Sequence, residues 1–164
     1  MIKGKIFDFE PMKPTPKGIP TNIYYEVVLK GIKVGYILLE NYDFKLGRAE
    51  IAYKVYKPFR RKGIATQMVK EFIDIIPGYF PLTFFDAKVK SENEASCRVL
   101  EKVGFDEKSS SGGLLEDRFE NRRYFFRDIE EEIMENDAEE KIEELNIIIA
   151  DLKNQNLWSW KCIN

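Results

Sequence analysis

The 164-residue sequence predicts an α+β fold in which a mixed β-sheet carries flanking helices. Three observations support this prediction. Segments rich in Tyr, Val and Ile come first, apolar residues then recur at helical spacing in two places, and a further apolar segment separates those two helices. The resulting order is β-β-β-loop-α-β-α-β-β, which is typical of an α+β domain.

The first three predicted strands lie between residues 23 and 56. Residues 1–20 are expected to be irregular, because four prolines and Gly18 interrupt helices and central strands. Residues 23–29 and 34–40 are predicted as a hairpin with a turn at 30–33. The third strand covers residues 50–56. Its alternation puts one set of side chains, Ile51, Tyr53 and Val55, opposite another set, Glu50, Ala52 and Lys54.

Two amphipathic helices alternate with the remaining strands. The first is predicted over residues 65–76 and ends at Pro77-Gly78. A strand over residues 82–89 follows. The second helix is expected to begin at a Ser91–Glu94 capping box and to run to about Lys102. Its predicted inward residues are Ala95, Val99 and Val103.

The second predicted helix leads into a second hairpin. Gly104 is expected at the position after the helix, where a left-handed conformation is common. Phe105 then begins a strand, and residues 122–127 close the hairpin after a loop at 109–113.

Charge divides the chain at about residue 128. Residues 1–127 hold 23 Lys or Arg and 17 Asp or Glu, whereas residues 128–164 hold 3 and 11. A basic domain with an acidic extension suggests that the domain binds an anion and that the extension has a separate role. The extension is predicted to be helical over 129–157, with an apolar stripe of Ile142, Leu145, Ile149 and Leu152, followed by Trp158 and Trp160.

Composition excludes several kinds of chemistry. The chain has no histidine, which removes His-dependent triads, His-ligated metals and the usual general base. Its two cysteines, Cys97 and Cys162, are far apart, so neither a zinc site nor a disulfide scaffold is expected. No signal peptide or membrane-spanning run is recognisable, and a cytoplasmic location is the expectation. We therefore expect any catalysis to use carboxylates, hydroxyls, Lys, Cys or backbone amides, without a metal.

The strongest local signal is the heptapeptide RRKGIAT, residues 60–66, between a strand and a helix. Gly63 allows positive φ and close backbone approach. The helix N-terminus that follows offers unpaired N–H groups to a phosphate, and Arg60, Arg61 and Lys62 add positive charge. Taken alone, this segment is equally compatible with a solvated basic turn.

Two longer segments resemble the GNAT superfamily of N-acetyltransferases. AEIAYKVYKPFRRKGIAT, residues 49–66, resembles the acetyl-CoA-binding motif, whose [QR]xxGx[GA] loop matches Arg60, Gly63 and Ala65. SENEASCRVLEKVGF, residues 91–105, resembles the second signature, NxxSxxxxEKxGF, in the form typical of the branch with ribosomal-protein and polyamine N-acetyltransferases. The resemblance covers about residues 22–127.

This resemblance implies how acetyl-CoA would bind. Two neighbouring parallel strands would split, with pantetheine in the gap and the N–H near Val55 polarising the acetyl carbonyl. The amides of residues 62–66, including Ile64, Ala65 and Thr66, would hold the pyrophosphate. Asn93 would bind pantetheine, with Ser96 nearby; capping of the helix is a second role open to Asn93.

Two departures from the family pattern concern catalysis. The tyrosine that protonates the leaving thiolate in many GNAT enzymes is replaced by Leu100, so Ser96, Tyr124 or a water must take its place. Only about twenty residues precede the first hairpin, where the family has a strand and two helices. The acceptor site is then either open or completed by the C-terminal extension or a partner subunit.

Glu50 is the candidate general base. It matches a strand glutamate with that role in several GNAT enzymes, and without histidine a carboxylate is the plausible proton acceptor. The alternative is a surface glutamate beside Lys54. Cys97 is expected to be a packing residue.

The function predicted from the sequence is acetyl transfer from acetyl-CoA to a primary amine by direct attack. Polyamines, aminoglycosides, amino acids and protein N-termini all remain open as acceptors. The alternative is a CoA-binding GNAT-fold protein with a regulatory or assembly role and little catalysis. Nucleic-acid binding lacks an aromatic-basic signature, and no membrane partner is expected. The predicted domains are 1–127, the GNAT acetyltransferase domain with a reduced N-terminal part, and 128–164, an acidic helical extension that could join a homodimer.

Overall fold

The computed structural model describes residues 1–12, 22–108 and 121–136, together with 139–140, 142–143, 146–147 and 150. The chain divides into two compact units, Met1–Asp128 and Ile129–Asn164. The first unit holds the sheet and the helices that pack on it. The predicted loop at 109–113 lies outside the described residues.

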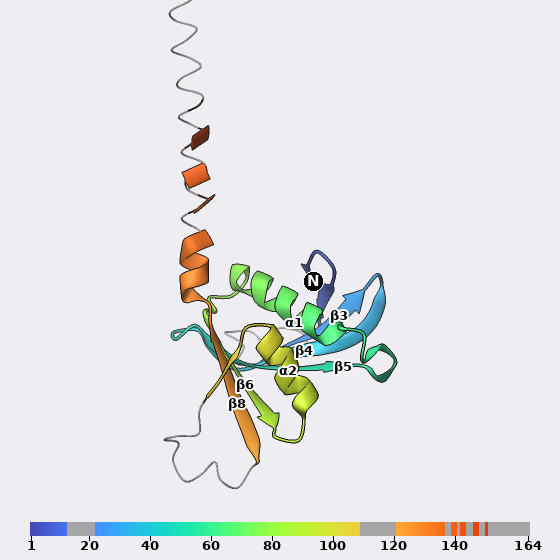
Figure 1. Ribbon diagram of the computed structural model, residues 1–164. Coiled ribbons are helices and arrows are strands. Elements are labelled where there is room, and N and C mark those ends of the chain that lie inside the picture. Colours follow the sequence, from blue (N-terminus) through green and yellow to red (C-terminus); the bar gives the residue numbers. More distant parts are fainter. Residues whose placement is uncertain are drawn as a thin grey trace, which may run out of the picture. The chain divides into compact units, whose positions relative to one another are not determined.

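The described part of the first unit is built on an eight-stranded sheet of order β1-β2-β3-β4-β5-β6-β8-β7 (Figure 1). Neighbouring strands are antiparallel except β5 and β6, which are parallel. The strands are β1 (Ile2–Lys3), β2 (Asp8–Pro11), β3 (Ile23–Leu29), β4 (Ile32–Asp43), β5 (Arg48–Val55), β6 (Phe84–Lys90), β7 (Asp106–Glu107) and β8 (Arg122–Asp128). This mixed sheet confirms the predicted α+β class.

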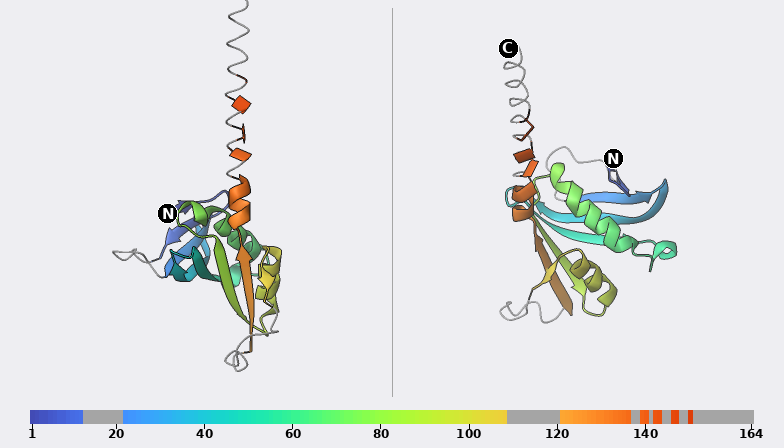
Figure 2. Two further views of the ribbon diagram at one scale, coloured as in Figure 1. Left: turned by 90° about the vertical axis from the view of Figure 1, so that its left-hand side faces the viewer. Right: turned by 45° about the horizontal axis from the view of Figure 1, so that its top comes forward.

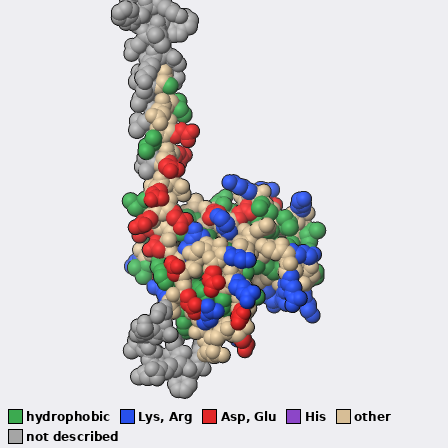
Figure 3. Space-filling view, viewed as in Figure 1, with side chains coloured by type: hydrophobic (Ala, Val, Ile, Leu, Met, Phe, Trp, Pro, Cys, Tyr) green, Lys and Arg blue, Asp and Glu red, His purple; other side chains and the backbone are tan. Residues whose placement is uncertain are grey.

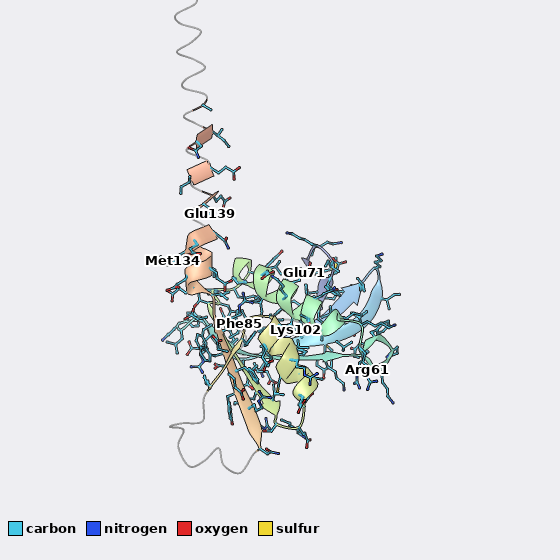
Figure 4. All side chains as sticks on the ribbon, viewed as in Figure 1. Arg61, Glu71, Phe85, Lys102, Met134 and Glu139 are labelled. Atoms are coloured by element: carbon cyan, nitrogen blue, oxygen red, sulfur yellow. The ribbon has the colours of Figure 1, made fainter. Side chains whose placement is uncertain are left out.

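The start of the chain differs from its prediction, because β1 and β2 extend the sheet beyond β3. Phe7 and Phe9 are buried there, and the Phe9 ring lies 5.2 Å from the ring of Phe72. The N–H of Ile6 donates to the carboxylate of Glu71 at 2.8 Å, which ties this segment to the helix below (Figure 4). The prolines do not prevent these strands, because Pro11 ends β2 near the edge of the sheet.

The predicted hairpin of β3 and β4 is confirmed, with a tighter turn than expected. Lys30 and Gly31 both have positive φ, 49° and 80°, as a two-residue turn of a twisted hairpin requires. The strand β4 consequently begins at Ile32 rather than at residue 34. Further along β4, a Cβ atom at Gly35 would clash with the backbone carbonyl of Lys54, so these two strands approach closely.

Both helices lie on one face of the sheet. They are α1 (Ile64–Ile75) and α2 (Glu94–Lys102). Tyr25 of β3 contacts Phe72 of α1, and Arg127 of β8 donates to the carbonyl of Val103 at the end of α2. The strand register places Tyr25 and Arg127 on the same face. Neither α1 nor α2 therefore covers the opposite face.

The second helix corrects two predictions. Its N-cap is Asn93, whose side-chain oxygen accepts from the Ser96 N–H at 3.2 Å, so the Ser91–Glu94 capping box is wrong. The buried residues are Cys97 and Leu100, followed by Val103, whereas the predicted Ala95 is exposed and Val99 is only partly buried. Gly104 has φ of 90°, as predicted.

The second unit contains helical residues from 130 to 136 and at described positions up to 150. The N–H of Ile133 donates to the carbonyl of Ile129 at 3.0 Å. Ile142, the described member of the predicted stripe, is 57% exposed. Leu145, Ile149, Leu152, Trp158 and Trp160 lie outside the described residues. No helix among the described residues is long and apolar enough to cross a membrane.

Candidate active site

The sheet splits between its two parallel strands. The strands β5 and β6 pair only from Arg48 with Phe84 to Glu50 with Asp86. Beyond Glu50, β5 runs on to Val55 without a partner on that side, while β6 continues in register with β8. The two halves of the sheet therefore spread apart (Figure 2), and backbone groups of β5 face the space between them.

Strand geometry identifies those backbone groups. The N–H of Tyr56 donates to Val34 of β4 at 2.8 Å, so the amide of residue 56 points toward β4. Amides alternate in direction along a strand, so the N–H groups of Val55 and Tyr53 point away from β4, into the split. The carbonyl of Val55 accepts from the side chain of Arg60 at 3.0 Å. The end of β5 thus offers outward N–H donors, as the family resemblance implied for Val55.

A cavity of about 520 Å³ lies against this end of β5. Its walls are β5, the loop and first turn of α1, and the first turns of α2. The lining residues are Tyr53, Lys54 and Val55; Phe59, Arg60, Arg61, Gly63, Ile64, Ala65 and Thr66; and Asn93, Ala95, Ser96 and Val99. Every predicted cofactor-binding residue lines it except Lys62.

The loop before α1 is basic, and the helix that it opens has an uncapped N-terminus. Gly63 is the N-cap with φ of 75°, and no side chain caps α1. The amides at the start of α1 therefore lie next to exposed Arg60, Arg61 and Lys62. Lys and Arg side chains gather at this end of the molecule (Figure 3), and Arg61 projects from the loop (Figure 4). Such an arrangement favours a phosphate ligand.

A pair of hydroxyl groups lies in the same cavity. The Tyr53 hydroxyl is 2.8 Å from the Ser96 hydroxyl and donates to the Ser96 carbonyl at 3.1 Å. Burial raises the pKa of Tyr53 to about 12, and the hydrogen bond with Ser96 opposes part of that rise. Tyr53 is a site residue that no sequence motif marks, although the predicted strand alternation puts Tyr53 and Val55 on one face.

Glu50 lies at the point where the strands separate, on the face opposite Tyr53. Its carboxylate is 3.2 Å from the Lys88 ammonium of β6, and its side chain is 19% exposed. This ion pair spans the last paired residues of β5 and the diverging part of β6. Glu50 does not line the cavity described above, so it reaches the split from the other side of the sheet.

The other catalytic candidates occupy different surroundings. Tyr124 of β8 is opposite Lys88 in the β6–β8 register, so β6 separates it from β5, and it does not line the cavity. Leu100, which stands at the position of the usual tyrosine, is fully buried and does not line the cavity. Cys97 is a free, buried residue of the α2 core, as predicted. Of Glu50, Ser96 and Tyr124, the cavity contains Ser96.

The described residues include no group of three or more His, Cys, Asp or Glu side chains that could hold a metal ion. The polar groups that face the cavity are instead cations, hydroxyls, an amide side chain and backbone N–H groups. Donor sets of this kind suit an anionic organic ligand with hydrogen-bonding amides.

Comparison with solved structures shows a shared fold. RimL, a ribosomal L7/L12 alpha-N-protein acetyltransferase in complex with coenzyme A, is 16% identical with a TM-score of 0.57, and the match covers 66% of this chain and 62% of that one. Spermidine N-acetyltransferase from Vibrio cholerae in complex with CoA and spermine is 19% identical with a TM-score of 0.56, and coverage is 65% of each chain. A probable acetyltransferase is 26% identical with a TM-score of 0.56, covering 68% and 64%.

The chain thus spans less than two thirds of the length of these solved relatives. No curated protein sequence matches it. The model of the acetyltransferase (GNAT) domain matches residues 13–106, which is more than half of the chain. The loop at Gly63, the split after Glu50 and the Asn93 cap all lie inside that match. The chain belongs to the GNAT acetyltransferase family.

Proposed function

We propose that the protein transfers the acetyl group of acetyl-CoA to a primary amine by direct attack. The observation that carries this proposal is the cavity that joins the N-terminus of α1 to the split between β5 and β6. One end offers cations and amides for a pyrophosphate, and the other offers strand N–H groups for a thioester. Known GNAT structures with CoA or acetyl-CoA support the choice of ligand.

Different cofactor-binding residues would bind different parts of acetyl-CoA. The amides of residues 62–66 and the side chains of Arg60 and Arg61 would bind the pyrophosphate. Asn93 would contact pantetheine through its amide nitrogen, because its oxygen is already used in capping α2. The N–H of Val55 points into the split, where it would polarise the acetyl carbonyl. Bound acetyl-CoA would supply the activated acyl group.

The catalytic candidates would act from both sides of the split. The amine would approach the acetyl carbon from the face that carries Glu50, which would accept the amine proton directly or through a water. As the carbon–sulfur bond breaks, sulfur keeps the electron pair. Ser96 in the cavity would donate a hydrogen bond to that sulfur. Tyr124 is the second candidate donor, and it is the less direct one because β6 separates its strand from β5.

The proposal is tested by titrating the full chain with acetyl-CoA in a calorimeter and by measuring CoA release with a panel of primary amines. The panel should contain a polyamine, an aminoglycoside, amino acids and N-terminal peptides. Saturable binding and release that depends on one of these amines are the expected results. A protein that binds no acetyl-CoA contradicts the proposal.

The buried Leu100 and the sheet face without described helices favour a second candidate function. Under this alternative the chain binds CoA and acts as a sensor or assembly subunit with little catalysis. Binding of acetyl-CoA without release of CoA to any amine in the panel would support the alternative over the enzyme.

We also propose that residues 1–127 form the acetyltransferase domain of a cytoplasmic protein and that residues 128–164 join two subunits. The exposure of Ile142, the described residue of the predicted stripe, supports the second part, because an apolar stripe on a helix needs a partner. Light scattering should then give twice the chain mass of 19.3 kDa. Ile142→Glu should lower that mass to one chain, and a monomeric parent protein contradicts the dimer.

A further inference from the structure

We propose that Tyr53 is a positioning residue that orients the Ser96 hydroxyl toward the sulfur of the bound thioester. The inference rests on the proposed acetyl transfer and deepens it. It assigns the hydrogen-bond donor for the leaving thiolate to a pair of hydroxyls on two elements, β5 and α2. Both hydroxyls therefore differ in position from the tyrosine of many GNAT enzymes, which Leu100 replaces in this chain.

The backbone of Ser96 is held from both sides. Its N–H is within hydrogen-bond distance of the Asn93 side-chain oxygen at 3.2 Å and of the Asn93 carbonyl at 3.1 Å. Its carbonyl accepts from the Tyr53 hydroxyl at 3.1 Å. The Ser96 backbone is therefore fixed at the first turn of α2, and the rotation of its side chain and hydroxyl group remains to be set.

The Tyr53 hydroxyl sets that rotation. It has one proton and two acceptors within reach, the Ser96 carbonyl at 3.1 Å and the Ser96 hydroxyl oxygen at 2.8 Å. When tyrosine donates to the carbonyl, the serine proton is used in a bond back to tyrosine. When tyrosine donates to the serine oxygen, the serine proton is released to point into the cavity. An anion in the cavity selects the second arrangement.

A developing thiolate is such an anion. As the acetyl carbon–sulfur bond breaks, sulfur takes the electron pair, Ser96 donates to sulfur, and Tyr53 donates to Ser96. Two linked hydroxyls donate more strongly than one because each polarises the other. The amine proton leaves separately through Glu50, so no proton needs to cross the sheet.

The pair donates a hydrogen bond and does not protonate the thiolate outright. The pKa of Tyr53 is raised to about 12 by burial, whereas an ordinary thiol has a pKa of about 8.5. Tyrosine therefore retains its proton at equilibrium, and water protonates the thiolate after release. Arg60 and Arg61, which line the same cavity, are both cations and also favour the anion.

Two conservative variants test the pairing. Tyr53→Phe and Ser96→Ala should each lower kcat about tenfold, because each removes a hydrogen bond that strengthens in the transition state. KM for acetyl-CoA should stay near the parent value. Because Tyr53 acts only through Ser96, the double variant should be no slower than Ser96→Ala alone. Tyr42→Phe is the matched control, because Tyr42 is a buried tyrosine of β4 that lies outside the cavity.

A second readout needs no acceptor amine. Thiolate absorbs in the ultraviolet, so the pKa of bound CoA can be titrated against a baseline with desulfo-CoA. Either variant should raise the pKa of the bound thiol by about 1 relative to the parent complex, while Tyr42→Phe should leave it unchanged. The inference would be overturned if the kcat losses of the two single variants multiply in the double variant. It would also be overturned if the pKa of the bound thiol is the same in the variants as in the parent complex. A parent protein that binds no CoA would instead refute the proposed function.

Discussion

Replacing Glu50 with glutamine is expected to lower the rate of amine acetylation about a hundredfold, because general base catalysis typically contributes a factor of that order or more. Glutamine keeps the shape of the side chain and cannot accept the proton of the attacking amine. Acetyl-CoA affinity should stay near the parent value, because Glu50 is on the sheet face opposite the cavity and does not line it. Steady-state kinetics with the identified amine, together with calorimetry, provide the measurement.

Glu50 also forms an ion pair with Lys88, so the loss of that pair needs its own control. Lys88→Met removes the pair and keeps the carboxylate. Glu26→Gln removes a similar pair, in which Glu26 lies 2.7 Å from Lys33 on the same sheet face and away from the split. Both controls should acetylate within a few-fold of the parent rate. If Glu50→Gln retains the parent rate and the parent pH profile, Glu50 is not the base.

Local patterns in the sequence were sufficient for most of the fold around the site. The β3–β4 hairpin, the alternation of β5, the extent of α1 and the positive φ of Gly63 all follow from nearest neighbours in the chain. Each of these features is decided by a turn, a period or a helix end, and those signals are local.

The errors occurred where distant residues decide the outcome. Phe7 and Phe9 have the spacing of a strand, but an alternation this short does not predict one by itself. Packing against Phe72 decides the structure there. In α2, both Ser91 and Asn93 are plausible caps, and tertiary packing decides the inward face, which contains Cys97 and Leu100.

The candidate site was predicted only where its residues belong to contiguous motifs, and not where contacts between distant residues define it. The basic loop and the Asn93 signature are contiguous motifs, and their residues line one cavity. Tyr53 belongs to no such motif, and the sequence pattern of a strand tyrosine on the inward face is that of a core residue. Only the 2.8 Å contact with Ser96, 43 residues further along the chain, distinguishes it. The separation of Tyr124 from the cavity likewise depends on the strand order, which the local pattern does not contain.

Replacing Gly63 with valine is expected to weaken acetyl-CoA binding at least about tenfold, because one charge-assisted hydrogen bond to a phosphate is worth roughly that factor. Gly63 has φ of 75°, a conformation that a β-branched residue adopts only with strain. A Cβ atom at this position would meet no protein atom within 4 Å, so the space beside it is open to a ligand. Valine would fill that space and disturb the amides at the start of α1.

Gly31 supplies a matched control for the backbone strain. It has φ of 80°, it likewise has no atom within 4 Å of an added Cβ, and it lies in the β3–β4 turn outside the cavity. Gly31→Val and Gly63→Val should therefore lower the melting temperature by similar amounts, because a valine in this conformation costs about 1–2 kcal/mol at either site. Calorimetric titration should separate them, with only the Gly63 variant losing affinity for acetyl-CoA. Parent affinity in a folded Gly63→Val protein would show that the loop does not hold the pyrophosphate. Equal losses of affinity in both variants would trace the effect to backbone strain rather than to the loss of contacts with the ligand.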